Sequence, residues 1–180
     1  RPIVEAVARC PQSSEPWQTI ETAPIDTDSR TFDGPTVLHA PRSLPELLQL
    51  RAAYPEAWLL AGGTDIGVRI SHDREVPSRI IHAGGVPALM TLVQHSDRIE
   101  VGAATTFRDM LPTIENHANP FAEMIRRLGS RQIRAMGTMG GNIGTASPIG
   151  DTLPVLLALG ATLHLASIRG RRAVAIDNYF

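Results

Sequence analysis

The sequence contains a single cysteine, Cys10, so the chain cannot form an internal disulfide or hold an iron–sulfur cluster with its own thiols. This scarcity favours a reducing, cytoplasmic location over an extracellular one. No apolar run approaches the roughly 20 residues that a membrane-spanning helix needs, and the N-terminus lacks the basic and apolar regions of a signal peptide. These absences predict a cytoplasmic protein that does not bind to a membrane.

An excess of charge of one sign is also missing, because 17 basic and 18 acidic residues leave a net charge of −1. A domain that binds nucleic acid or an anionic membrane surface usually carries a clear basic excess. We therefore expect neither as a partner, and instead small molecules or other protein surfaces. The 180 residues, 43% apolar and 19% charged, suffice for one sizeable domain or two small ones that share a core.

Periodic apolar positions are missing from residues 1–35, which are rich in proline, serine, threonine and acidic residues. Apart from a short helix expected at residues 3–9, this composition is typical of a linker. The first residue is Arg1 and not methionine, so we expect the chain to be a piece of a longer protein.

The folded part is predicted to begin at residue 36 and to have an α+β fold of two subdomains. The first subdomain, residues 36–95, starts with a strand and then a helix whose Ser43 and Glu46 form a capping box. The apolar run 57–61 predicts a strand covered on both faces, as in a parallel sheet, so that strand, helix and strand form a small βαβ unit. Also expected are a first strand at 36–40, a helical turn at 66–70, a strand at 79–82 and, within 86–94, a helical turn that leads into a strand.

The second subdomain, residues 96–180, is predicted to hold an antiparallel sheet with flanking helices. Thr106 is a suitable N-cap for a helix, and Pro112 is expected to start the turn that follows this helix. The last two strands form an antiparallel hairpin. Helices are expected at 107–111, 120–128 and 152–159, and strands at 99–103, 161–167 and 173–177.

Two glycine-rich stretches interrupt these elements, Ala61–Gly67 and Gly137–Asp151. The first lies at the carboxyl end of a predicted strand, which is where ligands of open α/β sheets bind. The second has five glycines among small hydroxyl residues, a composition that favours a loop over a helix or strand. Glycine content alone favours an ordinary surface loop, but the pair predicts two sides of one ligand site in a cleft between the subdomains.

The second stretch lacks the features of two familiar nucleotide sites. Its glycines do not follow the Gly-x-Gly-x-x-Gly spacing, and it contains no lysine for a P-loop. What remains is a run of backbone N–H groups and hydroxyls, which can hold a diphosphate through oriented amides. An ionised Asp151 only accepts hydrogen bonds, so we expect it to face sugar hydroxyls or a ring N–H. A ligand with a diphosphate, hydroxyls and a flat ring fits, and FAD is the natural candidate.

Both stretches resemble the flavin-binding loops of the FAD domain of molybdenum hydroxylases. Leu59-Leu60-Ala61-Gly62-Gly63-Thr64-Asp65 is similar to the first loop, and Gly137-Thr138-Met139-Gly140-Gly141-Asn142-Ile143 to the second. The similarity covers about residues 36–180. Within the family, Ala146-Ser147-Pro148-Ile149-Gly150-Asp151 resembles the xanthine dehydrogenase branch. Arg1-Pro2-Ile3 resembles the end of the cysteine-rich motif that closes the two-iron, two-sulfur domain of that branch.

The resemblance implies roles for individual residues. First-loop backbone would hold the FAD diphosphate, second-loop polar groups would contact ribityl, phosphate or ring atoms, and Ile143 would pack near the flavin ring. Leu128 would make an aliphatic contact where some relatives carry an aromatic residue. No catalytic acid, base or nucleophile and no metal ligand is implied. The implied cofactor-binding residues are Ala61, Gly62, Gly63, Thr64, Asp65, Ile66, Leu128, Thr138, Gly141, Asn142, Ile143, Thr145 and Asp151.

The resemblance also implies a place in a larger enzyme. The chain would be part of an iron–sulfur/FAD subunit that passes electrons from two-iron, two-sulfur clusters through FAD to NAD. The substrates, hypoxanthine and xanthine, would be oxidised to urate at a molybdopterin centre outside this chain. Its partners would be an upstream iron–sulfur domain and a molybdopterin-binding subunit in a hetero-oligomer, with a further C-terminal domain beyond residue 180.

Two alternatives stay open from the sequence. The chain could belong to another molybdenum hydroxylase, acting on an aldehyde, an N-heterocycle or an aromatic thioester. It could also be a non-catalytic docking domain whose glycine-rich stretches are only turns.

Overall fold

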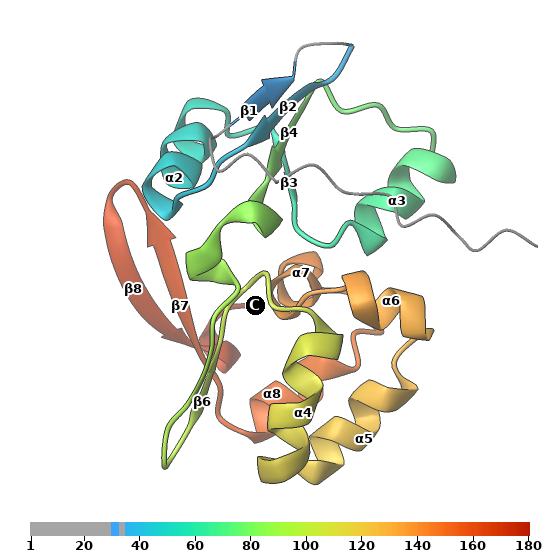
Figure 1. Ribbon diagram of the computed structural model, residues 1–180, viewed down its shortest axis with the longest axis vertical. Helices are drawn as coiled ribbons and strands as arrows, with labels where there is room; N and C mark the ends of the chain where they lie inside the picture. The colour runs from blue at the N-terminus through green and yellow to red at the C-terminus, as the bar shows by residue number, and fades with distance from the viewer. Residues whose placement is uncertain (1–29, 33–34) are drawn as a thin grey trace, which may run out of the picture.

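The computed structural model describes residues 30–32 and 35–180, which form a small sheet with two helices and a larger, mostly helical part (Figure 1). This arrangement confirms the predicted α+β class. The helix expected at residues 3–9, the thiol of Cys10 and nearly all of the predicted linker lie outside the described residues.

The small sheet has the strand order β1-β2-β4-β3. Strands β2, β4 and β3 are parallel, whereas β1 pairs with β2 in the antiparallel sense. The two strands of the predicted βαβ unit are therefore parallel, but β4 lies between them. The strands are β1 (Arg30–Phe32), β2 (Val37–Ala40), β3 (Trp58–Leu60) and β4 (Arg79–His82), so the sheet begins before residue 36.

Strand β3 lies at the edge of this sheet, and the prediction that it is covered on both faces is wrong. The side chain of Leu59 is 50% exposed. On the other side of the strand, the guanidinium of Arg69 lies 3.8 Å from the ring centre of Trp58. A short apolar run indicates burial but does not distinguish a central strand from an edge strand that packs on one face only.

Helix α2 (Leu44–Ala53) begins as the capping box predicts. The Oγ of Ser43 accepts the N–H of Glu46 at 3.4 Å, while the Glu46 carboxylate accepts the N–H of Arg42, one residue before the cap, at 3.2 Å. The helix buries Leu47 against the sheet. The core of this part consists of the buried residues Leu47, Ala57, Ile81, Ala83 and Val86.

The larger part begins with a hairpin of β5 (Leu92–Gln94) and β6 (Ile99–Val101), so the predicted boundary at residue 95 falls in its turn. In the described residues, the antiparallel strand pairs of this part are this hairpin and a second one, β7–β8. Further elements of the structure are η1 (Ala83–Gly85), η2 (Pro87–Leu89), α5 (Asn119–Arg127), α6 (Arg131–Met136), α8 (Thr152–Ala158), β7 (Thr162–Ser167), β8 (Gly170–Ala175) and η3 (Ile176–Asn178).

Helix α4 (Phe107–His117) starts at the predicted cap, where the Oγ of Thr106 accepts the N–H of Asp109 at 3.1 Å. It continues through Pro112, so the prediction that Pro112 starts the next turn is wrong. Proline removes one hydrogen bond from a helix interior. That loss is offset because the helix buries Met110 on one side of the proline and Ile114 on the other.

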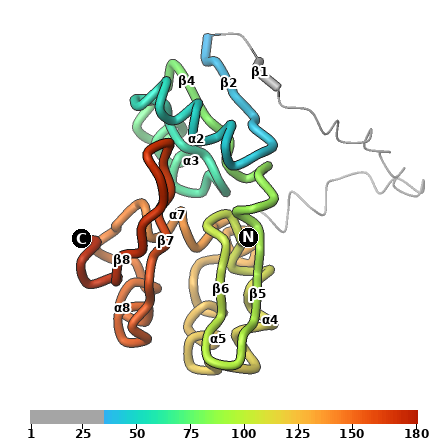
Figure 2. Tube along the Cα trace, turned by 90° about the vertical axis from the view of Figure 1, so that its left-hand side faces the viewer, coloured from blue at the N-terminus to red at the C-terminus, as the bar shows by residue number. Residues whose placement is uncertain are grey.

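The core of the larger part lies between α4 and α5 and includes Met139, which comes from the second glycine-rich stretch. The β7–β8 hairpin runs along one side of the molecule, and β7 contacts α2 of the small sheet (Figures 1 and 2). None of the helices in residues 30–32 and 35–180 is long and apolar enough to cross a membrane.

Candidate flavin site

The first glycine-rich stretch connects β3 to helix α3 (Thr64–Ser71), which is longer than the predicted turn. Gly63 is the N-cap residue and has a φ of 75°, a left-handed conformation that favours glycine. It offers no side chain to cap the helix. The first intrahelical bond joins the N–H of Gly67 to the carbonyl of Gly63 at 2.8 Å. The N–H groups of Thr64, Asp65 and Ile66 are therefore able to receive an anionic ligand.

The second glycine-rich stretch contains a helix, α7 (Met139–Thr145), so the prediction of a loop throughout is wrong. The Oγ of Thr138 caps this helix by accepting the N–H of Gly141 at 3.1 Å. Gly140 donates its N–H to the Ala103 carbonyl at 2.9 Å, and a methyl group on its Cα would lie 2.6 Å from that oxygen. Although Gly140 lies within a helix, glycine is needed at this position because the backbone of α7 approaches the backbone of Ala103 closely.

The two stretches touch through their backbones at Gly62. A methyl group on Gly62 would lie 1.6 Å from the carbonyl oxygen of Met136 and 3.2 Å from the nitrogen of Gly137. Figure 1 shows the start of α3 facing α6 and α7 across the space between the two parts of the molecule. The structure therefore brings together the two stretches that the sequence predicted to be two sides of one site.

A third segment, residues 103–106, supports the second stretch and was missed by the sequence analysis. The carbonyl of Gly137 accepts the N–H of Phe107 at 3.0 Å, and the N–H of Met139 donates to the Thr105 carbonyl at 3.2 Å. Thr106 and Thr138 form an isolated antiparallel bridge. The run of small residues from Gly102 to Thr106 is the signal that could have indicated this close packing.

Most predicted polar side chains of α7 have partners within the protein. Thr145 donates its hydroxyl to the Gly141 carbonyl at 2.9 Å. Asn142 accepts the hydroxyl of Thr152 at its Oδ1, and Thr152, also missed in the sequence, is fully buried. The bond between Thr152 and Asn142 joins α8 to α7 and fixes the orientation of the Asn142 side chain. A hydroxyl or an amide can form more than one hydrogen bond, so a cofactor contact by the same groups is compatible with this arrangement.

The other predicted residues divide into apolar and acidic ones. Ile143 and Leu128 are partly buried and pack against the core of the larger part, Leu128 from the C-terminal end of α5. Asp65, in the first turn of α3, and Asp151, just before α8, are both exposed. Their carboxylates suit hydroxyl or ring N–H donors of a ligand and not its phosphates.

His82 is a further residue at the carboxyl ends of the parallel strands, and it was not among the residues predicted from the sequence. It ends β4 and pairs in register with Leu60, directly before the first stretch. Burial of the imidazole, together with the positive charge of Arg42, lowers the pKa of His82 below its usual value of 6.5. The side chain is therefore neutral near pH 7.

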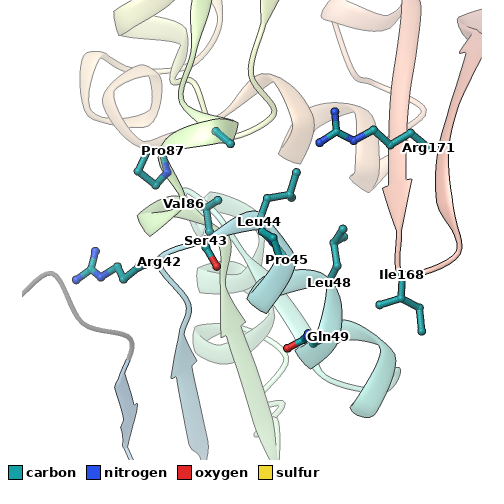
Figure 3. A pocket seen from close by; sticks show the side chains of 11 residues that line it. Arg42, Ser43, Leu44, Pro45, Leu48, Gln49, Val86, Pro87, Ile168 and Arg171 are labelled. Carbon is teal, nitrogen blue, oxygen red and sulfur yellow. The ribbon is translucent and has the colours of Figure 1, made fainter.

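A cavity of about 640 Å³ lies elsewhere, between the start of α2, η2 and the tip of the β7–β8 hairpin (Figure 3). None of the predicted cofactor-binding residues lines it. The candidate site is accordingly defined by the N–H groups at the start of α3 and by the backbone contact that joins the two glycine-rich stretches, and not by this cavity. Residues that line the cavity include Arg42, Ser43, Leu44, Leu48, Ile168 and Arg171.

The residues at the two stretches fit a flavin dinucleotide. The N–H groups in the first turn of α3, which have no partner within the helix, suit the diphosphate, and the absence of a side chain at Gly63 permits close approach of a large ligand. The fold and these donors define the class of protein, a dinucleotide-binding α+β domain.

Comparison with known proteins identifies the family. Residues 30–180 match the family described as the FAD binding domain in molybdopterin dehydrogenase. The chain belongs to this family, which confirms the resemblance and FAD as its cofactor. Among curated relatives, a xanthine dehydrogenase from Drosophila pseudoobscura pseudoobscura is 33% identical over 161 residues, covering 83% of this chain and 12% of that protein. The nicotinate dehydrogenase FAD-subunit of Eubacterium barkeri is 32% identical over 145 residues, covering 78% of this chain and 49% of that subunit.

Solved structures share the fold. A carbon monoxide dehydrogenase from Hydrogenophaga pseudoflava superposes with a TM-score of 0.75 at 28% identity, covering 79% of this chain and 51% of that one. Quinoline 2-oxidoreductase from Pseudomonas putida 86 gives a TM-score of 0.72 at 27% identity, covering 76% and 49%. The chain thus spans about half of each of these two matched chains and a much smaller share of the xanthine dehydrogenase.

Proposed function

We propose that this chain binds FAD between the N-terminus of α3 and helix α7, as the flavin segment of a xanthine dehydrogenase. When bound, FAD supplies the redox chemistry that links iron–sulfur clusters to NAD during oxidation of hypoxanthine and xanthine to urate. The observation that carries the proposal is the backbone contact between Gly62 and Met136, because it joins the two stretches into one site.

The chain's own residues bind and orient the cofactor. The N–H groups of Thr64, Asp65 and Ile66 would hold the diphosphate, with favourable alignment to the helix dipole. Backbone and polar groups of Thr138, Gly141, Asn142 and Thr145 would contact the ribityl chain, phosphate or ring.

Three further predicted contacts complete the proposed site. Asp151 would accept hydrogen bonds from hydroxyl or ring N–H donors. Ile143 would pack near the flavin ring, and Leu128 would add an aliphatic contact beside it. We propose no acid, base or nucleophile from this chain, because a flavin site needs the protein chiefly for binding, orientation and electrostatics.

An N-heterocycle other than a purine is the second candidate substrate for the enzyme that contains this chain. It is supported by the similarity to the nicotinate dehydrogenase FAD-subunit, which matches with almost the same identity as the xanthine dehydrogenase. In either case we propose an iron–sulfur domain and a molybdopterin-binding subunit as partners, and a cytoplasmic hetero-oligomer.

The test is purification of the full chain together with any subunits that accompany it. We expect a yellow protein that releases about one FAD per chain on denaturation and whose flavin is bleached by NADH without oxygen. The assembled enzyme should reduce NAD with xanthine, and nicotinate should be compared at equal concentration. A correctly assembled protein that takes up no FAD would contradict the proposal, and bleaching by nicotinate alone would favour the second substrate.

A further inference from the structure

Two chain segments meet at Gly84, which lies two residues after strand β4. A methyl group on Gly84 would be 2.7 Å from Nε2 of His82 and 3.4 Å from the carbonyl oxygen of Ala61. The imidazole of His82 and the first residue of the first glycine-rich stretch thus both border the same face of Gly84.

The position of the ring follows from the sheet. Strands β3 and β4 are parallel neighbours, and Leu60 pairs with His82, so Ala61 leaves the sheet beside His82. The imidazole is partly buried, and no hydrogen bond of its ring is found in residues 30–32 and 35–180. Burial and the nearby Arg42 lower its pKa, which keeps the ring uncharged. The side chain therefore acts here mainly through its shape.

A continuous series of backbone contacts leads from His82 to α7. The His82 ring and the Ala61 carbonyl both border the position that a Gly84 methyl group would take, the next residue Gly62 abuts the Met136 carbonyl, and Met136 leads into Gly137 and the α7 cap Thr138. A displacement of Ala61 would therefore change the separation between the first turn of α3 and helix α7.

We propose that His82 is a positioning residue of the flavin site, whose ring supports the first glycine-rich stretch at the separation from α7 that FAD requires. This inference rests on the proposed binding of FAD. It assigns no contact between His82 and the cofactor, since the effect passes through Ala61 and Gly62.

The test is a double-mutant cycle on the FAD dissociation constant of the full chain. Gly84→Ala should displace the ring, because its methyl group would lie 2.7 Å from Nε2, and His82→Ala should remove the support, so each should weaken FAD binding about tenfold, or about 1.4 kcal/mol. In His82→Ala/Gly84→Ala the new methyl group fills part of the space left by the ring. The double variant should therefore bind FAD more tightly than either single variant, and not less tightly as additive effects require.

Two further variants separate positioning from a general loss of structure. His82→Gln keeps a side chain of similar reach, so its FAD dissociation constant should stay within about threefold of the wild-type value. Gly85→Ala is the matched control, because its methyl group would face Arg42 and Pro41 and not Ala61. It should leave FAD affinity within the same range. The ligand-free melting temperature and the flavin absorption spectrum are recorded for every variant.

Additive losses in the double variant, or unchanged affinity in both single variants, would overturn the role of His82 while FAD binding by the wild type stands. If Gly84→Ala fails to fold, the comparison of His82→Ala with His82→Gln decides alone: equal loss in both sinks the inference. Absence of FAD from the assembled wild type would overturn the proposed function, and this inference with it.

Discussion

At Gly62 a single hydrogen allows two backbones to lie in contact. A methyl group there would occupy the position of the Met136 carbonyl, at 1.6 Å, and both partners are main-chain atoms that cannot turn aside. The strictest requirement in the site is therefore steric, because no side chain fits between Gly62 and the Met136 carbonyl. Electrostatic complementarity comes second, from N–H groups that the helix start leaves unbonded.

We predict that Gly62→Ala lowers FAD affinity by at least about tenfold, a loss of about 1.4 kcal/mol, because the two stretches must move apart. Fluorescence titration of the flavin measures the change. Gly67→Ala is the control, since a methyl group there has no neighbour within 4 Å. Equal affinities of Gly62→Ala and the wild type would show that the contact does not shape the site.

Thr152 is a second residue with a defined task, since its buried hydroxyl donates to Asn142. Thr152→Val keeps the shape but leaves the Asn142 oxygen without this donor, so we expect a loss of about 1–3 kcal/mol in the free energy of unfolding. Urea denaturation measures it, with Thr162→Val on the exposed part of β7 as the control. A neutral effect of Thr152→Val would indicate that Asn142 finds another donor.

At the scale of elements, helix α7 connects local structure to the site. Its N-terminus depends on Thr138, just as that of α6 depends on Ser130, whose Oγ accepts the N–H of Ile133 at 3.2 Å. In both caps the hydroxyl oxygen accepts the N–H of the residue three positions on, but only the first cap belongs to a predicted cofactor-binding stretch.

Removing either cap, by Thr138→Ala or Ser130→Ala, should lower stability by about 1 kcal/mol. Only Thr138→Ala should also weaken FAD binding, and Thr138→Ser should restore it. Thermal melts and flavin titrations on the three variants check this. The expectation fails if Ser130→Ala weakens FAD binding as much as Thr138→Ala does.

Elements that carry local signals could be predicted from the sequence. The capping residues Ser43 and Thr106 marked the starts of α2 and α4, and alternation marked the β7–β8 hairpin. Helix α7 could not be predicted, because glycine is a poor helix former and the contact of Gly140 with Ala103, which explains the glycine, joins distant segments. The helix end predicted at Pro112 was wrong because tertiary packing also decides there. Burial of Met110 and Ile114 outweighs the hydrogen bond that the proline cannot form.

The site itself was predicted in part. The position of the first stretch after a strand indicated a ligand edge, and the structure joins it to the second stretch. The supporting residues Ala103, Thr152 and His82 have no local motif, since their roles arise from contacts with distant segments. The cofactor contacts of the individual side chains remain predictions that the variants above can test.

At the scale of the whole molecule, His82 makes stability depend on pH. Because its pKa is lower in the folded protein than the usual 6.5, the unfolded chain takes up the proton first as the pH falls. The contribution of the neutral ring is fully present above about pH 6.5 and is lost as the pH falls below that value towards the folded pKa.

We therefore expect the wild type to lose more stability than His82→Gln between pH 7 and pH 5. Denaturation curves at several pH values measure the difference, in which other titrating groups cancel. Parallel pH profiles for the two proteins would contradict the expected role of this histidine.

The contact between Gly62 and Met136 joins residues that are far apart in the chain, so forming it closes a long loop. Such contacts carry a large entropic cost of closure and tend to form late in folding. Each part can acquire its own core beforehand, since the two buried clusters draw on different segments. The cofactor site would then be the last region to assemble and the first to open, and bound FAD would slow that opening. Hydrogen exchange at Gly62 and Gly137, followed with and without FAD, should show this protection more strongly than exchange in either core.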